Sequence, residues 1–331
     1  MEPVAPGSVS VVIPVHDNAG TVAACLRSVA AQTLRPAELI LVDDRGRDGA
    51  VAVARRTLAG LDLPHRVIAH ERNRGAGAAR NTGLARATGT WVWFLDSDDE
   101  ADPRFLARMV EAGTAYGAGI VACRTRRVGP DGTPREVDEP PWERAVVAGP
   151  EAARLLLRNR VRAYPCNKLF RRTALPAGVW DEGRAYEDFL PTLRLLLDAP
   201  RVALVDEPLY RYTANPVSVS ARFGRHTFDL LAVAEDVRAE LARRGLARAW
   251  RAEHLGYRYL NVVLPLANMA LRAEHRGHAD RDTRAAVAAA RGRTRMVDLA
   301  ALAVAGWLRA AVAGGVLKLS PGLYSRVLAS R

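Results

Sequence analysis

The chain has few cysteines, and its N-terminal segment lacks the pattern of a secretory signal. Its three cysteines, Cys25, Cys123 and Cys166, are odd in number and lack the spacing of metal ligands. Buried thiols in a reducing compartment therefore fit them better than a disulfide framework. The first residues, MEPVAPGSVS, have no basic segment followed by an apolar one, so no secretory signal is expected. We expect a cytoplasmic protein.

Aromatic residues are scarce, although the chain is basic. Its net charge is +12, from 48 basic and 36 acidic residues, yet only 6% of residues are aromatic. A positive charge of this size suits nucleic acid, an anionic membrane surface or phosphorylated substrates. No basic run is interleaved with aromatic residues, which is what single-stranded nucleic acid would need for base stacking. Nucleic acid is therefore not expected as a partner.

The C-terminal tail lacks an apolar run of membrane-spanning length. Residues 299–308 and 310–317 are apolar, but Arg309 separates them, and neither approaches the ~20 residues that span a bilayer. An amphipathic helix lying at the inner face of the plasma membrane is one interpretation. A helix packed on its own protein is the favoured alternative, and contacts within an oligomer remain open.

What the sequence does contain is a regular alternation of apolar segments. Five segments in the first 130 residues are typical of strands, and most are nearly continuous apolar runs, as in a parallel sheet buried on both faces: residues 9–15, 37–44, 65–71, 90–96 and 118–128. Helical periodicity fills the intervals at 19–31, 48–59, 76–87 and 103–116. This order predicts βαβ units and a doubly wound, Rossmann-like, mostly parallel α/β sheet.

The remaining segments predict a second region. Residues 129–142 have the composition of a loop or hairpin, and helices are expected at 149–159 and from about 186. A strand returns at 201–213, and from about 226 the chain is rich in alanine, leucine and arginine, which favours helix. At 331 residues, about two domains are expected. We place them at 1–222 and 223–331, the second being a C-terminal helical extension.

Acidic residues follow three of the expected strands. Asp17 comes after the first, Asp44 after the second, and Asp96, Asp98 and Asp99 after the fourth. Ligands of doubly wound sheets bind outside the carboxyl ends of the strands, so these carboxylates should converge. They predict a hard divalent cation, Mg²⁺ or Mn²⁺. Helix caps are the alternative, but capping explains poorly an Asp-Ser-Asp-Asp sequence directly behind an apolar strand.

A glycine-rich segment, RNRGAGAARNTG at 72–83, follows the third strand. It begins like a dinucleotide fingerprint, but Arg80 takes the place of the third glycine, and the fingerprint belongs after the first strand. A Rossmann dehydrogenase is therefore rejected. The segment is interpreted as a loop that approaches a ligand closely, with Asn73 and Arg80 as polar contacts. For Arg80 the alternative is an arginine that only solvates a helix face.

Six motifs in order resemble the family-2 glycosyltransferases with the GT-A fold. They are VSVVIPVHDNAGTVAACLRSVAAQTL, ELILVDDRGRDG, NRGAGAARNTGLARATGTWVWFLDSDD, CNKLFRR, YEDF and VDEPLYRYTANPVSVS, and they cover roughly residues 9–222. The resemblance implies an inverting, metal-dependent transfer of a sugar from a nucleotide-diphosphate sugar, usually a UDP-sugar, to an acceptor hydroxyl. Cell-envelope or polysaccharide biosynthesis is the implied setting, and the acceptor could be lipid-linked.

The resemblance also implies roles for individual residues. Asp44 matches the aspartate that holds the base, and Asp96 and Asp98 match the Asp-X-Asp motif, with Asp98 as the direct metal ligand. Asp188 of YEDF matches the general base, although first-turn acids that complement a helix dipole are an alternative. The remaining matches are contacts to the nucleotide: Pro14, Val15, Asp17, Asn73 and Arg80.

The sequence departs from the family pattern at several positions. His16 replaces a tyrosine of the first loop, and Arg45 and Arg47 stand beside the expected base pocket. The arginine that usually precedes the SVS loop is absent, so either Arg211 or Arg222 substitutes, or the loop closes differently. No QxxRW motif of processive synthases is found, which favours transfer of one or a few sugars. The alternative functions are nucleotidyl transfer, whose basic phosphate loop the sequence lacks, and a non-catalytic protein that binds sugar nucleotides or anionic surfaces.

Overall fold

The computed structural model describes residues 7–129, 131–214 and 222–329. The chain divides into two compact units. Unit 1 comprises Met1–Leu156 and Arg160–Asn215, and unit 2 comprises Leu157–Asn159 and Pro216–Arg331. The SVS loop at 218–220 lies outside the described residues.

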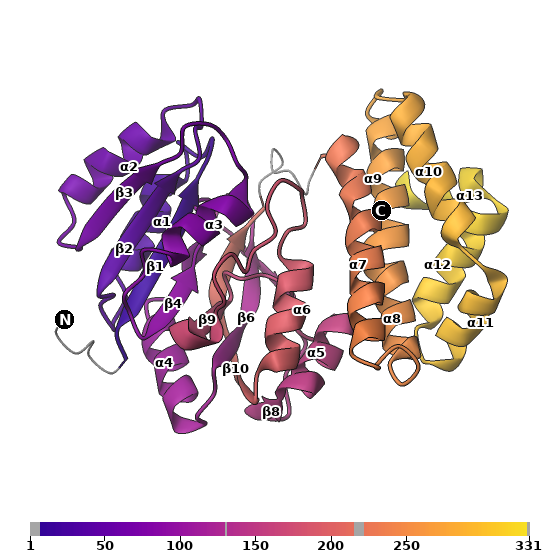
Figure 1. The fold of residues 1–331 in the computed structure, drawn as a ribbon. Coiled ribbons are helices and arrows are strands. Elements are labelled where there is room, and N and C mark those ends of the chain that lie inside the picture. Colours follow the sequence, from indigo (N-terminus) through magenta and orange to yellow (C-terminus); the bar gives the residue numbers. More distant parts are fainter. Residues whose placement is uncertain (1–6, 130, 215–221, 330–331) are drawn as a thin grey trace. The chain divides into compact units, whose positions relative to one another are not determined.

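Four parallel strands form the first half of the sheet in unit 1 (Figure 1). They lie in the order β3-β2-β1-β4, and each neighbouring pair is parallel: β1 (Val9–Val15), β2 (Glu38–Asp43), β3 (His65–Ala69) and β4 (Trp91–Phe94). The helices between and after them are α1 (Val22–Ala30), α2 (Ala50–Ala59), α3 (Ala76–Leu84) and α4 (Phe105–Ala115). This arrangement confirms the predicted βαβ units.

The second half of the sheet is mixed. β9 (Lys168–Arg171) runs antiparallel between β4 and β6 (Ile120–Val128), and β10 (Arg201–Thr213) lies parallel to β6. Three short strands pair antiparallel with these: β5 (Glu100–Ala101), β7 (Pro134–Val137) and β8 (Val146–Ala148). The expected hairpin at 129–142 contains β7. The helices of this half are α5 (Gly149–Leu157), a 3-10 turn at Arg172–Ala174, and α6 (Phe189–Asp198).

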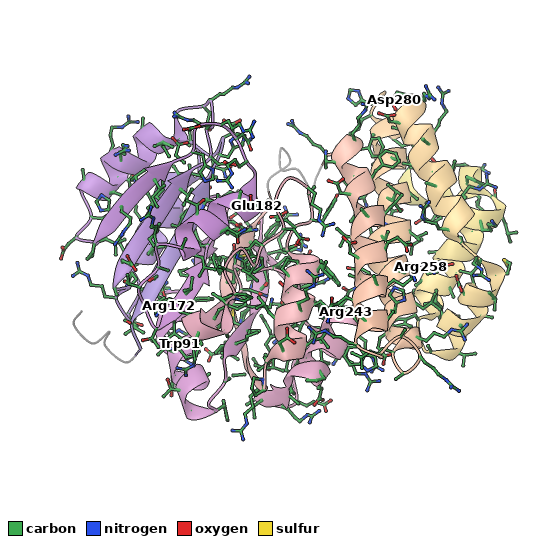
Figure 2. All side chains as sticks on the ribbon, in the orientation of Figure 1. Trp91, Arg172, Glu182, Arg243, Arg258 and Asp280 are labelled. Carbon is green, nitrogen blue, oxygen red and sulfur yellow. The ribbon has the colours of Figure 1, made fainter. Side chains whose placement is uncertain are left out.

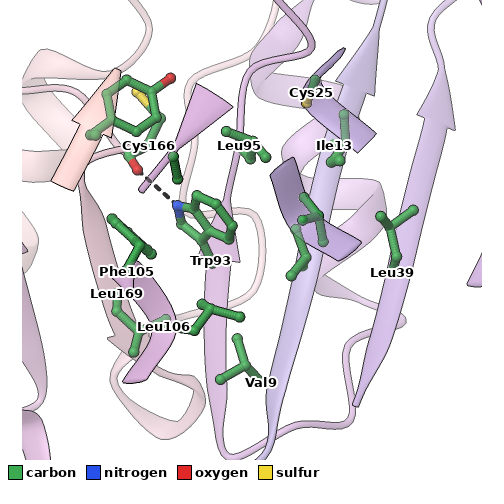
Figure 3. Packing of buried hydrophobic residues seen from close by; sticks show 14 of the residues in the cluster. Val9, Ile13, Cys25, Leu39, Trp93, Leu95, Phe105, Leu106, Cys166 and Leu169 are labelled. Carbon is green, nitrogen blue, oxygen red and sulfur yellow. Dashed lines mark hydrogen bonds between the residues drawn. The ribbon is translucent and has the colours of Figure 1, made fainter. Parts of the chain in front are cut away.

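The strand β1 is apolar on both of its faces, and helices cover both faces of the sheet and bury it. Its odd-numbered residues join the cluster of buried side chains from α1, α2 and α4. Val12 instead faces α3, where a Cβ on Gly83 would lie 2.2 Å from Cγ1 of Val12. On the first face, Trp93 stacks on Phe105 with 4.4 Å between ring centroids and donates from Nε1 to the Cys166 carbonyl (Figure 3). All three cysteines are buried and unpaired, as expected.

Unit 2 is helical throughout its described length after residue 225. A 3-10 turn (Arg225–Phe228) leads into its helices, and a π-helical segment (Arg258–Val263) joins the second to the third. The helices are α7 (Asp229–Arg243), α8 (Arg251–Tyr257), α9 (Leu264–His275), α10 (Arg281–Arg293), α11 (Met296–Val304), α12 (Leu308–Leu319) and α13 (Pro321–Ala329). Within the described ranges, no helix has the length and apolar character needed to cross a membrane.

Candidate active site

The carboxyl ends of β1, β2 and β4 bring three of the predicted acidic positions to one edge of the sheet. Asp17 follows β1, Asp44 follows β2 and Asp96 follows β4, and the parallel register aligns these ends. Figure 2 shows Glu182 at this edge and Trp91 and Arg172 at the opposite one. The residues at this edge, together with 180–188, are called the candidate active site below.

Asp44 is only 2% exposed and anchors the start of the glycine-rich segment. Its two carboxylate oxygens accept hydrogen bonds from the backbone N–H groups of Arg74 and Gly75, each at 2.8 Å. Nδ1 of His70 lies 2.7 Å from the same carboxylate. Asp44, which the family resemblance matches to base recognition, therefore fixes the start of the glycine-rich segment. His70 was not identified from the sequence, because nothing in its local pattern indicates a partner 26 residues away.

The first loop is joined to the loop after β2. Asp17 has a left-handed backbone, with φ of 49°, and its Oδ1 accepts hydrogen bonds from the backbone N–H groups of Arg47 and Asp48. The hydrogen bond from Arg47 is the largest cause of a lowered pKa for Asp17. A Cβ on Gly46 would lie 2.6 Å from the Asp17 nitrogen, so only glycine permits this approach.

The other residues predicted near the nucleotide fall into two groups. Val15 is fully buried and belongs to the core, while Pro14 is half-buried at the end of the same strand. Asn73 is exposed, and its Nδ2 lies 3.1 Å from Nε2 of His16. His16, the substitute for the family tyrosine, thereby connects the first loop to the glycine-rich segment. Arg45 donates from Nε to the carbonyl of His70.

Arg80 is buried and links two acidic groups from distant parts of the chain. Its Nη2 lies 2.8 Å from Oδ1 of Asp96, and its Nη1 lies 2.7 Å from Oε1 of Glu187. Its residue exposure is 5%, so the alternative of an arginine that only solvates a helix face is wrong. Its Nε is buried without a hydrogen-bond partner. The neighbouring carboxylates raise the pKa of Arg80 despite burial, so the guanidinium stays charged.

The aspartates behind β4 differ in their surroundings. Asp99 is buried, accepts a hydrogen bond from the Tyr210 hydroxyl, and accepts a second from the Thr213 N–H at 2.8 Å. Burial raises the pKa of Asp99, as do the charges of Asp98 and Asp96. The Asp96 side chain is 31% exposed, and Asp98 is half-buried. Asp96 and Asp98 are therefore less buried than Asp99.

Among the described residues, the possible metal-ligand atoms that lie close together include Asp96 but not Asp98. Oxygen and sulfur atoms of Asp96, Asp99 and Cys166 lie within 4.8 Å of one another. Burial raises the pKa of the Cys166 thiol well above its usual range, which makes it a poor ligand, since a metal binds the thiolate. Asp99 already accepts two hydrogen bonds. Of the three, the partly exposed carboxylate of Asp96 suits Mg²⁺ or Mn²⁺ best, because these cations prefer oxygen ligands.

Asp188 lies at the N-cap position of α6, yet its side chain makes no capping hydrogen bond. Burial is the largest cause of a pKa raised to about 6, followed by the charge of Glu187. The residue that precedes this pair, Tyr186, has a left-handed backbone with φ of 57°. Such backbone strain is characteristic of functional sites. A half-buried carboxyl with a raised pKa and no capping role is suited to exchange a proton near neutral pH.

The segment 180–187 is fastened to α3. Asn81 donates from Nδ2 to the Trp180 carbonyl at 2.8 Å and accepts from the Trp180 N–H at 3.0 Å. A Cβ on Gly77 would lie 1.9 Å from the Asp181 carbonyl oxygen. Asn81 and Trp180 were not predicted from the sequence to belong to the site. The signal that could have indicated this close packing is the presence of two glycines inside a helical pattern.

The motif CNKLFRR forms a buried polar network behind the site. Lys168 is fully buried and donates from Nζ to the carbonyls of Arg162 and Tyr164 at 2.6 and 2.8 Å. Burial lowers the pKa of Lys168 to about 8. Asn167 donates to Oε1 of the buried Glu139 at 2.9 Å. The network holds residues 162–167 in place on the sheet.

A mostly parallel sheet of this order, with acidic loops at its carboxyl edge and an antiparallel strand in its centre, has the GT-A architecture. The sequence model of Glycosyl transferase family 2 matches residues 10–178. The chain belongs to this family, whose members are glycosyltransferases.

The chain is similar to several bacterial members of the family. It is 32% identical over 220 residues to the uncharacterized glycosyltransferase EpsJ of Bacillus subtilis, covering 64% of this chain and 62% of that protein. It is 28% identical over 259 residues to the putative glycosyltransferase EpsH of the same organism, covering 74% and 72%. A shorter match, 38% identical over 125 residues, joins it to the succinoglycan biosynthesis protein ExoO of Rhizobium meliloti, covering 38% and 35%.

Solved structures confirm the fold. The structure of S. aureus TarS 1-349 in complex with UDP-GlcNAc superposes with a TM-score of 0.65 at 18% identity, covering 98% of this chain and 90% of that one. The mannosyltransferase PcManGT from Pyrobaculum calidifontis, in complex with GDP-Man and Mn²⁺, gives a TM-score of 0.52 at 17% identity, covering 96% and 90%.

Proposed function

We propose that this protein is an inverting, metal-dependent glycosyltransferase that moves a sugar from a nucleotide-diphosphate sugar to an acceptor hydroxyl. The observation that carries the proposal is the bridge of Arg80 between Asp96 and Glu187. It places the Asp-X-Asp motif and the YEDF motif, about 90 residues apart in sequence, in one charged cluster. Residues 1–222 would form the catalytic domain, with 223–331 available for acceptor, membrane or oligomer contacts.

The residues of the site divide the chemistry between them. Asp188 takes the proton of the acceptor hydroxyl as that oxygen forms its bond to the anomeric carbon. The bond from this carbon to the diphosphate breaks on the opposite face, and the diphosphate leaves with the electron pair. Asp96 and Asp98 would hold a divalent cation, which would neutralise charge on the diphosphate when bound. Arg80 keeps the two carboxylate groups at a fixed separation.

We propose that the nucleotide of the donor sugar is UDP. The residues that would bind it are Pro14, Val15, Asp17, Asp44, Asn73 and Arg80. Val15 can contribute only its backbone, because its side chain is fully buried. Asp44 would meet the base beside the loop that it anchors. The TarS structure holds UDP-GlcNAc and the PcManGT structure holds GDP-Man. Both nucleotides therefore belong in the test.

We place the reaction in polysaccharide or cell-envelope biosynthesis, on the cytoplasmic side of the cell. Support comes from the name of the relative ExoO, a succinoglycan biosynthesis protein. Three buried, unpaired cysteines are consistent with a reducing compartment.

Calorimetric titration with UDP, GDP, CDP and dTDP, each with Mn²⁺ and with EDTA, tests the donor site. The expected result is metal-dependent binding of UDP that Asp98→Ala abolishes, while the distant surface variant Tyr116→Ser binds normally. Absence of binding by all four nucleotides in the presence of metal would refute the proposed site.

Donor hydrolysis and transfer then separate the enzyme from a non-catalytic sugar-nucleotide-binding protein of the same fold. We expect Asp188→Asn to bind UDP with the affinity of the unmodified protein and to lose turnover. Anomeric analysis of the product by NMR should show inverted configuration. If the protein binds the nucleotide but turns over none of the UDP-sugars or GDP-sugars, the non-catalytic binding protein is favoured. A product that retains the anomeric configuration of the donor would exclude Asp188 as the base.

A further inference from the structure

Exposed apolar side chains are concentrated at the end of unit 2. Of the nine large apolar side chains that are exposed among the described residues, only Tyr116 lies elsewhere. The other eight lie on α11, α12 and α13: Met296, Val297, Val304, Leu308, Val312, Leu319, Leu323 and Val327. Solvent-exposed apolar groups that cluster in this way mark interaction surfaces.

The junction of α11 and α12 is built to hold three of these side chains outward. Trp307 packs on α8, where a Cβ on Gly256 would lie 2.7 Å from Cζ2 of the indole. Leu302 and Leu317 are fully buried in unit 2. On the other side, Val304, Leu308 and Val312 are 91%, 62% and 57% exposed. Leu308 and Val312 are four residues apart and lie on one face of α12, and Val304 ends α11 just before it; we call these three side chains the apolar edge.

The surroundings of the apolar edge are basic. Residues 276–331 contain ten arginines and lysines but only three acidic residues, and each acidic residue already has a partner. Asp280 caps α10, Asp282 pairs with Arg225, and Asp298 is buried and lies 2.8 Å from Arg258. Arg309, next to Leu308, and Arg326, next to Val327, are exposed.

We propose that α11, α12 and α13 dock on the surface of an anionic lipid bilayer. The apolar edge would enter the boundary between headgroups and acyl chains, while Arg309 and Arg326 meet lipid phosphates. A second copy of the chain is a poorer occupant, because a two-fold contact would bring the unneutralised arginines of both copies together. Anionic lipid supplies the complementary charge. This inference is independent of the proposed sugar transfer.

Co-sedimentation of the full chain with vesicles tests the proposal. The protein should bind vesicles of phosphatidylglycerol and phosphatidylcholine, and bind vesicles of phosphatidylcholine alone about tenfold more weakly or worse. Added salt should weaken the binding. Replacing the apolar edge, Val304→Ser with Leu308→Ser and Val312→Ser, should abolish it. Arg309→Gln with Arg326→Gln should remove the preference for phosphatidylglycerol.

Tyr116→Ser, which removes the exposed large apolar side chain outside this region, is the matched control and should leave vesicle binding unchanged. All substituted positions are exposed, and circular dichroism verifies that each variant folds. No binding by the unmodified chain, or full binding by the apolar-edge variant, would overturn the proposal. A third result would also overturn it. If sedimentation velocity shows a dimer that the apolar-edge variant loses, and the protein does not bind vesicles, then a second copy of the chain covers this face.

Discussion

At the scale of single residues, Arg80 stands between two carboxylates that would otherwise repel each other. Replacing it with methionine keeps much of the side-chain volume but leaves Asp96 and Glu187 without their ion-pair partner. Breaking a buried ion pair by removing one member typically costs 3–5 kcal/mol; since both carboxylates retain some solvent contact, we expect about 2–3 kcal/mol.

Urea unfolding measures this loss for Arg80→Met. Arg326→Met, on the exposed face of α13, is the control and should change the free energy of unfolding by less than about 0.5 kcal/mol. Equal effects of the two substitutions would show that the bridge contributes nothing beyond a surface arginine.

The raised pKa of Asp188 predicts that kcat/KM depends on pH. Its pKa is raised to about 6, so the carboxylate that accepts a proton predominates above this pH, and kcat/KM should fall as the pH drops below it. Glu187→Gln removes the neighbouring negative charge that helps to raise this pKa, and the acid limb should therefore move to lower pH. Asp188→Asn should reduce kcat by about 10²–10⁴-fold.

The pH profile of kcat/KM for the unmodified chain, Glu187→Gln and Asp188→Asn provides the check. An acid limb that stays in place after Glu187→Gln would show that another group titrates. A limb that persists in the residual activity of Asp188→Asn would have the same meaning.

Site residues could be predicted from the sequence where a motif follows the end of a strand. Their interaction partners could not be predicted where these come from a distant segment. The aspartates after β1, β2 and β4 were found because apolar strands precede them. The pairs formed at the site were not predicted: Tyr210 bonds to Asp99 across 111 residues of sequence, and Glu187 meets Arg80 across 107. Only the folded sheet brings such pairs together.

At the scale of elements, α3 depends on a glycine at its first turn. The Cβ of Gly77→Ala would lie 1.9 Å from the Asp181 carbonyl oxygen, so the segment 180–187 must shift away. We expect a loss of stability of about 1–3 kcal/mol, as for other overpacked positions. We also expect a loss of activity, because this segment leads to Glu187 and Asp188.

Gly292→Ala is the matched control for Gly77→Ala. Gly292 lies in α10, and a Cβ there would meet nothing within 4 Å. Helix propensity alone should then stabilise the protein, by about 0.5–1 kcal/mol. Thermal unfolding compares the two variants, and a neutral Gly77→Ala would show that the segment 180–187 yields at no cost.

Among the elements, the parallel strands could be predicted, but β9 could not. β1 is apolar except for Ser10, β2 contains the apolar run Leu39–Val42, and turn signals bound both strands. β9 has four residues, KLFR, and begins with a lysine, which is rarely buried. Three oxygen acceptors satisfy the Lys168 ammonium, and none of them can be recognised as its partner from local sequence.

At the scale of the whole molecule, ligand binding should stabilise the fold. A ligand that binds only the native state adds about 2.7 kcal/mol at a concentration of one hundred times its Kd. UDP with Mn²⁺ should therefore raise the unfolding temperature of the full chain, and EDTA should cancel the gain. Asp98→Ala should unfold at the same temperature with and without the ligands. Differential scanning calorimetry makes the comparison, and stabilisation of Asp98→Ala equal to that of the unmodified chain would place the metal elsewhere.

The antiparallel position of β9 has a consequence for synthesis on the ribosome. β4 ends at residue 94 and β6 at residue 128, yet the strand that joins them begins only at residue 168. Until then, the nascent chain carries two apolar strands whose facing edges have no partner, and such edges promote association with other chains. The facing edges of β4 and β6 therefore stay exposed while the ribosome adds the roughly 40 residues between the end of β6 and the start of β9. A chain released before residue 171 should aggregate, whereas one released after residue 213 has its central sheet complete.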